Sequence, residues 1–360
     1  MSDTPKIYIA GMGMISPVGA RVAMCAASVQ AGINRYRHSR YYSRAGQPIT
    51  MGLLPEELFT SMPLDREDPD YDSKQHERVI KMAILALREA VSGLTIKQPI
   101  PLILAMPEPV ENVMRLEPQA LIASLVRQPD LPLSEAKSHS IETGRAATIQ
   151  GLELAQRYLY EGGEDYVLLG GSDSYYGYTR LTPLDEHSRL LTSGSMDGFA
   201  PGEGAAFLLL TRHPQLALCR DQHIIALGQP GIAQEPGHLQ SDEPYRGEGL
   251  DLAFKQALKD YTGIPIHTIY SSMNGESYWA KEYGVAFIRN KKAFQDKVKI
   301  EHPADCYGDL GAATAAALIA LAAESLFKHK GPATHLVYSS SDSAWRAAVR
   351  LEKIEQAANA

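Results

Sequence analysis

The residues from Ser140 to Leu152, SIETGRAATIQGL, have the pattern of a turn that presents a reactive side chain. A β-type run leads into a glycine, and an amphipathic helical segment begins at about Ala146. Such a turn places a side chain at a helix N-terminus, where free N–H groups and the helix dipole favour an anion such as a thiolate. The residue at the tip is Arg145, a permanent cation that cannot act as a nucleophile. The turn therefore has the shape for covalent catalysis without the reactive group.

Few other residues offer nucleophilic chemistry. Cys25, Cys219 and Cys306 are far apart, odd in number and free of any CxxC spacing, so we expect neither a disulfide framework nor a zinc site. We also expect no cofactor and no other metal. His139 lies on the strand that enters the turn, where a core or interface histidine is the simpler interpretation. The string SSSDS at 339–343 has no nearby histidine and does not indicate a Ser-His-Asp triad.

The elements that would position these residues follow an α/β pattern. Short β-branched runs alternate with helical ones, which is typical of largely buried strands. Apolar residues at helical spacing before a glycine predict a helix at 76–94, and the glycines of GMG are predicted to end the first strand. Residues 35–72 are predicted to form an irregular insertion. From about residue 222 the order of elements repeats, and residues 143–155 parallel 309–321, so we expect an internal duplication.

The bulk composition excludes several classes of function. With 360 residues, 44% of them hydrophobic, the chain can bury one large core or two fused halves. A net charge of −7 gives no overall basic field, so we expect no nucleic acid partner. The start MSDTPK has no secretory pattern, which predicts a cytoplasmic protein. The Ala-rich run at 311–326 is shorter than the roughly 20 residues of a membrane span, so we expect a buried helix and no span.

Four segments resemble the thiolase-fold condensing enzymes, most closely the β-ketoacyl-acyl-carrier-protein synthases, in order and spacing over almost the whole chain. They are IYIAGMGMISPVG at 7–19, GRAATIQGLELA at 144–155, DGFAPGEGAAFLLL at 197–210 and YGDLGAATAAAL at 307–318. The third is the most specific, because DGF followed by GEGA is an unusual string of glycines. The first alone leaves open a dinucleotide-binding loop, but Gly11, Gly13 and Ser16 depart from GxGxxG and no suitably placed acidic residue follows.

The resemblance implies an α/β fold of two similar βαβαβαββ halves, packed as an α-β-α-β-α layered sandwich and usually forming a homodimer. We place a thiolase-like N-terminal half at 1–212, which includes the insertion at about 35–72, and a thiolase-like C-terminal half at 213–360. The resemblance also implies that the strand after the nucleophile helix, here about 165–169, pairs across the two-fold axis of the dimer.

Family chemistry needs a cysteine at the turn and two further residues, both histidines in the ketoacyl synthases, and all three positions differ here. The cysteine position falls on Arg145 and the first histidine position on Asn274, in SSMNGESY. The second histidine position falls on Gly308, or on Asp309 if the alignment shifts by one residue. The family's glycine-rich turn near the C-terminus is replaced by SSSDSAW at 339–345. The resemblance thus implies the fold, while the residues argue against covalent acyl transfer.

A cation at a helix N-terminus is opposed by the dipole and needs an anionic partner when buried. The family fold would bring four carboxylates towards the pocket, those of Glu142, Glu276, Asp309 and Asp342. Either Arg145 fills a pocket that has lost its catalytic groups and pairs with one of these carboxylates, or it binds a carboxylate or phosphate ligand. The candidate pocket residues are Arg145, Asn274, Glu276, Asp309 and Asp342.

Two classes of function remain open. The first is a catalytically degenerate synthase-like protein that acts as a binding or accessory partner, either beside a type VI secretion effector or as the non-condensing partner of an active synthase. The second is an enzyme of lipid or polyketide metabolism, an acyl-thioester-dependent acyltransferase or a ketoacyl synthase. No general base is evident for an enzyme, although Asn274 and Arg145 offer donors that polarise a carbonyl. We therefore expect a homodimer with a protein partner, which is a secreted effector, an acyl carrier protein or a synthase.

Overall fold

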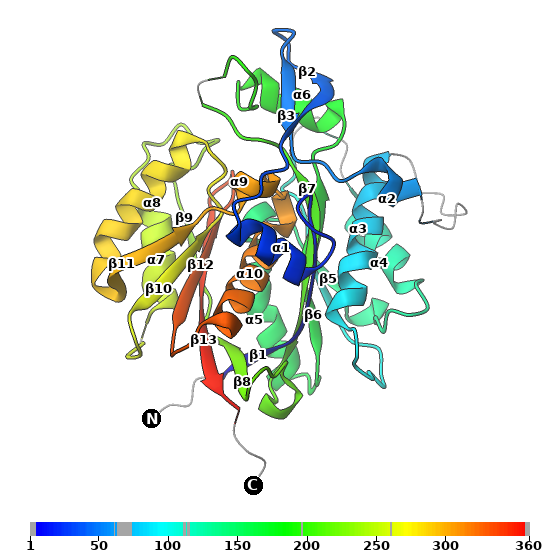
Figure 1. Cartoon of the computed structure of the whole chain (residues 1–360), viewed down its shortest axis with the longest axis vertical. Coiled ribbons are helices and arrows are strands. Elements are labelled where there is room, and N and C mark those ends of the chain that lie inside the picture. Colours follow the sequence, from blue (N-terminus) through cyan, green and yellow to red (C-terminus); the bar gives the residue numbers. More distant parts are fainter. Residues whose placement is uncertain are drawn as a thin grey trace.

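The computed structural model describes residues 5–60, 62, 74–110, 113, 116–195, 197–259 and 261–356. Figure 1 shows two groups of strands separated by helices, with further helices on both outer sides; the first and last strands, β1 and β13, reach the bottom of the view. This is the predicted α-β-α-β-α sandwich. The predicted boundary between residues 212 and 213 stays a prediction.

The first sheet has the strand order β1-β7-β6-β4-β5. The bounds of its strands are β1 (Ile7–Ile15), β4 (Leu102–Ala105), β5 (His139–Ile141), β6 (Val167–Ser174) and β7 (Glu203–Thr211). β7 is antiparallel to both β1 and β6, whereas β4 is parallel to both β6 and β5. All residues of β1, β4, β6 and β7 are buried, because helices cover both faces of the sheet.

The second sheet repeats this order as β8-β13-β12-β10-β11, with β9 also paired to β13. The bounds of its strands are β8 (His223–Leu227), β9 (Gly231–Gln234), β10 (Ile266–Ser271), β11 (Phe294–Glu301), β12 (Thr334–Ser340) and β13 (Trp345–Glu355). β13 is antiparallel to β8 and β12, and β10 is parallel to β12 and β11. The senses of pairing match those of the first sheet, so the predicted duplication is confirmed. β8 also pairs with β1, and this contact joins the two sheets.

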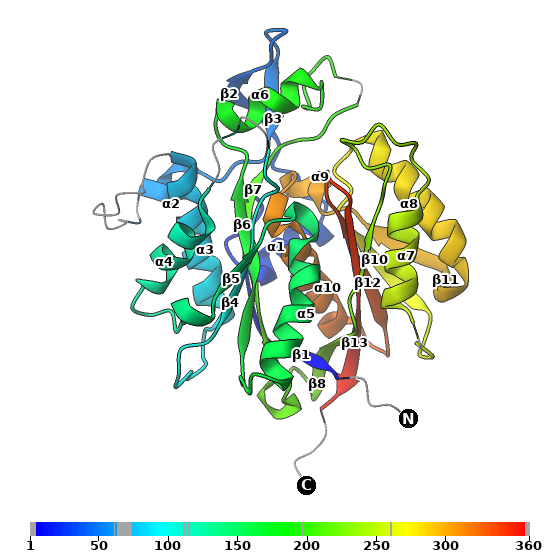
Figure 2. The ribbon, with the colours of Figure 1, turned by 180° about the vertical axis from the view of Figure 1, so that it is seen from behind.

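Three helix layers complete the sandwich, as Figure 1 and Figure 2 show from opposite sides. α3 (Lys74–Ala90) and α4 (Pro118–Val126) cover the outer face of the first sheet, and α7 (Glu248–Ala257) and α8 (Ser277–Asn290) cover that of the second. α1 (Val22–Gln30), α5 (Ala147–Tyr160) and α10 (Thr314–Lys328) lie between the sheets. The shorter helices are α2 (Glu56–Thr60), α6 (Tyr178–Glu186) and α9 (Ala304–Tyr307).

The helical segment Gly311–Lys328 is the one part of the described chain that is long and apolar enough to span a membrane, judged by length and composition. Within the fold, 83% of this segment is buried, and α10 packs against elements of both sheets. A helix that is apolar on all sides belongs in such a position. The predicted buried helix is therefore confirmed.

The prediction that the first strand ends at its glycines is wrong. The strand continues through them to Ile15. A Cβ atom at Gly11 would lie 2.0 Å from the carbonyl oxygen of Ala90, and one at Gly13 would lie 1.8 Å from that of Ala86. The two glycines thus allow α3 to pack directly on the strand backbone. They do not form a phosphate-binding loop, and the dinucleotide-binding alternative is wrong.

The insertion at 35–72 is regular, not irregular, over most of its described part. β2 (Arg37–Tyr42) and β3 (Pro48–Met51) form an antiparallel hairpin, and α2 follows. The hairpin is ordered by burial of Tyr41, Ile49 and Met51 against a small apolar cluster that includes Tyr175 and Phe199. Residues 63–73 lie outside the described residues.

The strand predicted to form the dimer edge, at about 165–169, lies inside the sheet. β6 is hydrogen-bonded to β4 on one side and to β7 on the other. The end of the sheet is instead β5, which pairs with β4 alone among the described residues. The prediction is wrong because the connection through α5 carries the chain past β4, so that order along the sequence differs from order in the sheet.

Candidate functional site

The turn at Arg145 has the predicted form. β5 ends at Ile141, Gly144 adopts a φ of +61°, and a single 3-10 turn at Gly144–Ala146 leads into α5. The C-terminal half fixes this backbone: the Ser339 hydroxyl donates to the carbonyl of Arg145 at 2.7 Å. Arg145 itself is only 3% exposed. Its guanidinium therefore needs compensating charge from within the protein.

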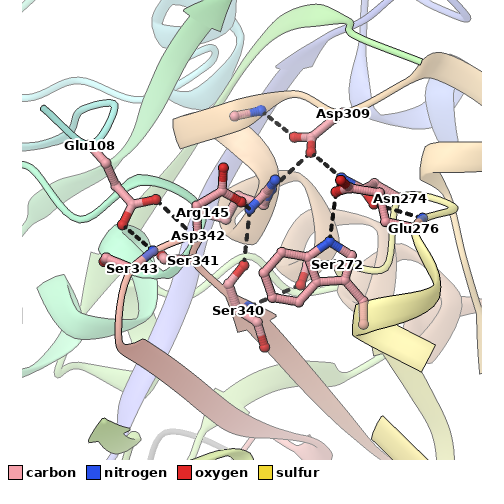
Figure 3. A network of polar contacts seen from close by, with 12 residues as sticks. Glu108, Arg145, Ser272, Asn274, Glu276, Asp309, Ser340, Ser341, Asp342 and Ser343 are labelled. Carbon is pink, nitrogen blue, oxygen red and sulfur yellow. Dashed lines mark hydrogen bonds and ion pairs between the residues drawn. The ribbon is translucent and has the colours of Figure 1, made fainter. Parts of the chain in front are cut away.

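Two carboxylates of the C-terminal half supply this charge (Figure 3). Arg145 Nε donates to Asp309 Oδ2 at 2.8 Å, and Nη1 donates to Asp342 Oδ1 at 2.8 Å and to the Ser340 carbonyl at 3.3 Å. The guanidinium carbon lies 5.2 Å from the centre of the Trp279 ring. Nη2 has no hydrogen-bond partner within the described residues. The expected ion pair is thus present, and the Nη2 group is left without a bond.

A second arginine extends the pair into a network. Arg189, which follows α6, donates from Nε to Glu276 Oε1 at 2.7 Å and from Nη1 to Asp342 Oδ2 at 2.6 Å. Asn274 Nδ2 donates to Glu276 at 3.1 Å and to Asp309 at 2.9 Å. The five predicted pocket residues therefore lie together, although Glu276 contacts Arg189 and not the arginine of the turn. Nothing singled out Arg189 in the sequence beyond its place in the polar loop before DGF.

The electrostatics of the network keep its arginines and Asp342 charged. Burial lowers the pKa of Arg145, but Asp309 and Asp342 together more than reverse this effect, so its pKa lies well above the usual range. Burial raises the pKa of Asp342, but Arg145 and Arg189 outweigh burial and hold that pKa below the usual range. Neither group is suited to exchange a proton near neutral pH, so neither is a general acid or base there.

Glu108, which was not predicted, closes the other side of the turn (Figure 3). Its Oε2 accepts the N–H of Asp342 at 2.9 Å, and its Oε1 accepts the N–H of Ser343 at 3.0 Å. Burial raises the pKa of Glu108, and the charge of Asp342 raises it further. Its position after β4 was the available signal, because the carboxyl ends of the parallel strands β4 and β5 meet at one sheet edge. The N–H groups of Asp342 and Ser343 are therefore bonded to Glu108 and are not free to bind a ligand.

A cavity of about 1020 Å³ opens beside the network. Its lining includes Arg145, Arg189, Glu276 and Asp342, together with the turn of the β2–β3 hairpin and residues of α6. Among the described residues, no three His, Cys, Asp or Glu side chains gather in a way that could hold a metal ion. The site is thus a cavity that is lined in part by the charged side chains of the network.

The other residues considered for chemistry lie elsewhere. Cys25 and Cys306 are buried, Cys219 is exposed, and none belongs to the cavity lining as the described residues form it. Burial raises the pKa of the Cys25 thiol to about 11 and also raises that of Cys306, so neither is a thiolate near neutral pH. His139 is exposed on β5, not in the core. Glu142 lines a smaller cavity of about 150 Å³.

Solved structures share this architecture, although no protein-family model matches the chain. The chain is similar over 97% of its length to the ishigamide ketosynthase/chain length factor, covering 99% of that chain at 18% identity with a TM-score of 0.75. It is similar over 98% of its length to one chain of a complex between a type II polyketide synthase acyl-carrier protein and its ketosynthase, covering 100% of that chain at 16% identity with a TM-score of 0.75. A mutant ketosynthase from module 6 of the bacillaene synthase of Bacillus subtilis matches with a TM-score of 0.78, at 17% identity, over 98% of this chain and 73% of that one. The chain has the ketosynthase fold.

Within this ketosynthase fold, the two positions that the resemblance assigns to histidines serve different purposes. Asn274 follows β10, and its amide is committed to two carboxylates. Gly308 has a φ of +87°, and a Cβ there would lie 2.8 Å from the carbonyl oxygen of Ala200, so this position serves the backbone. Its neighbour Asp309, the alternative in the alignment, reaches Arg145 instead. The arrangement offers ion pairing and an unbonded Nη2 group of Arg145 but no imidazole at these positions.

Proposed function

We propose that the chain is a catalytically degenerate ketosynthase-fold protein that acts as a non-catalytic binding or accessory partner of another protein. One observation carries the proposal: Arg145 stands at the helix start where an acyl-bearing residue is needed, and it is buried between Asp309 and Asp342. A guanidinium cannot carry an acyl group as a thioester or ester does. The turn thus serves to tie the two halves together.

The test is incubation with acetyl-CoA and malonyl-CoA, followed by intact-protein mass spectrometry and an assay of malonyl decarboxylation. We expect no acyl adduct and no decarboxylation above background, whereas an active ketosynthase treated in parallel shows both. A stoichiometric adduct on Cys306 would contradict the proposal, because it would mean that another residue had taken over acyl transfer.

Two kinds of partner are compatible with this proposal. An active ketosynthase is favoured by the similar structures, which include the ishigamide ketosynthase/chain length factor and a ketosynthase in complex with its chain length factor from Xenorhabdus doucetiae. An accessory role beside a type VI secretion effector is the other, suggested by the sequence resemblance. Both place the chain in the cytoplasm. Co-expression with each neighbouring gene product distinguishes them: co-purification with a cysteine-containing synthase or acyl carrier protein supports the first, and co-purification with a toxin or spike-tip protein supports the second.

One observation favours the enzymatic alternative, an acyltransferase or ketoacyl synthase of lipid or polyketide metabolism. The cavity of about 1020 Å³ has room for a substrate, and Arg145 is one of its lining residues. Against it, the amide of Asn274 is already bonded to Glu276 and Asp309. Turnover of an acyl-phosphopantetheine substrate without a covalent adduct would establish this alternative.

We further propose a homodimer formed through β5. This short strand ends the first sheet and has one unpaired edge among the described residues. An antiparallel contact with β5 of a second copy would continue the sheet and remove that edge. Light scattering at micromolar protein concentration tests the proposal, and a monomer would contradict it.

A further inference from the structure

The β2–β3 hairpin has a charge pattern unlike that of the rest of the chain. Residues 22–55 contain four arginines, Arg35, Arg37, Arg40 and Arg44, and no Asp or Glu, in a protein of net charge −7. All four arginines are exposed. Figure 1 shows the hairpin projecting at the top of the molecule, beyond the layers of the sandwich. The hairpin is thus a protruding element whose sequence carries four positive charges and no carboxylate.

The protein neutralises these arginines only in part. Arg44 Nε lies 3.6 Å from Asp185 Oδ2, but the Arg44 side chain stays 61% exposed. Arg40 contacts the hydroxyl of Tyr176 and lies 5.0 Å from the centre of its ring. The charge of Glu56 acts on Arg40, but the described residues form no ion pair with it. Within the described part of the chain, Arg37 donates to two backbone carbonyls, at 3.4 and 3.5 Å. These guanidinium groups keep N–H donors for a partner.

Exposed aromatic side chains lie beside the arginines. Tyr42 at the end of β2 is 57% exposed, and Tyr178 at the start of α6 is 54% exposed. The buried Tyr41 connects the two elements, since its ring meets that of Tyr178 edge-to-face at 5.0 Å. Tyrosine and arginine are the residue types enriched at protein interfaces and at their energetic hot spots.

The hairpin is held in place before any partner binds. The N–H of Arg35 donates to the carbonyl of Cys306 at 2.9 Å, and that of Thr50 donates to the carbonyl of Leu191 at 2.8 Å. The buried apolar cluster under Tyr41 fixes the middle of the hairpin. A preordered surface loses less conformational entropy on binding than a flexible one.

We propose that this arginine hairpin, residues 35–51 together with Tyr178, docks an acidic segment of a partner protein. This inference rests on the proposed function as a binding protein and specifies the chemistry of the partner. Guanidinium groups bind carboxylates through paired N–H donors, and the exposed tyrosines supply apolar contact area. A single-stranded nucleic acid is the other polyanion that arginine and tyrosine side chains can bind, and the test compares the two.

The test measures binding of a fluorescein-labelled oligoglutamate peptide by fluorescence anisotropy at low salt. The test variant carries Arg35→Gln, Arg37→Gln, Arg40→Gln and Arg44→Gln. The matched control removes four exposed charges from the opposite half with Lys291→Gln, Lys292→Gln, Lys297→Gln and Lys299→Gln. We expect the test variant to weaken binding at least about tenfold and the control to change it less than about twofold, because only the first group faces the peptide. Binding by the wild type should also weaken as salt is added.

A second variant with all four arginines changed to lysine guards against misfolding. It keeps the charge, so we expect intermediate affinity and an unchanged melting temperature. Equal losses in the glutamine variant and its control would overturn the proposal, as would tighter binding of a single-stranded oligonucleotide of the same charge. The acyl-adduct assay is independent: an adduct together with intact peptide binding would contradict the proposed function alone.

Discussion

Replacing Arg145 by alanine should destabilise the fold strongly. Asp309, whose side chain is 1% exposed, would lose its cation and keep only the N–H donors of Asn274 and Gly311. Asp342 would retain Arg189. Leaving one carboxylate buried without its cation costs roughly 3–5 kcal/mol. That is a large part of the roughly 5–15 kcal/mol by which a domain is stable, so Arg145→Ala should be easy to distinguish from the wild type.

Urea denaturation at neutral pH measures this loss, provided that the m-value stays constant. Arg88→Ala is the matched control, because Arg88 and Asp130 form an ion pair whose side chains are 42% and 49% exposed. That exposed pair should be worth only about 0.2–1 kcal/mol. The double variant Arg145→Met with Asp309→Asn removes both charges and should recover most of the loss. If Arg145→Ala loses no more than Arg88→Ala, or if the double variant recovers nothing, the buried ion pair does not stabilise the fold as reasoned here.

Three further predictions follow from the site and the sheet. Arg145→Cys should produce neither an acyl adduct nor condensation, because Asn274 and Gly308 supply no imidazole; intact mass after malonyl-CoA treatment checks this, and an adduct on the new cysteine would count against it. The pKa of Asp342 is lower in the folded state than in the unfolded state, so its stabilising contribution is present above the unfolded pKa of about 3.9 and is lost as pH falls towards the folded pKa. Between neutral pH and about pH 3, the urea midpoint should therefore fall more steeply for the wild type than for Asp342→Asn. Parallel curves would refute this. His139→Glu places like charges on both copies of β5 near the dimer axis and should give a monomer in light scattering; dissociation caused instead by Lys297→Glu would assign the dimer contact to β11.

Elements with a clear periodic pattern, and the order in which elements repeat, could be predicted from the sequence. The periodicity at 76–94 matches α3, and the repeated order of elements matches the two sheets. Residues 277–301, which form α8 and β11, carried no clear signal, because β11 ends its sheet and alternates charged with partly buried residues. The strand at the edge of the first sheet could not be predicted either, because no local sequence pattern indicates that β5 lies outside β4.

The site shows the same division. Five of its residues were predictable because the family's turns carry them. Arg189 and Glu108 were not identified from the sequence, because their partners are distant along the chain. Glu108 accepts hydrogen bonds from the backbone of Asp342 and Ser343, which lie 234 and 235 positions further on. Polar contacts of this kind leave no periodic trace in the sequence, whereas a buried helix or strand does.

The ionic network has a consequence for the order in which the chain folds. Arg145 meets Asp309 across 164 positions and Asp342 across 197, so loop closure of the whole second half must come before either contact. The ion pairs therefore cannot form before the chain has been made and folded as far as Asp342. They can stabilise the finished fold, but they cannot guide the first part of the chain while it is still being made.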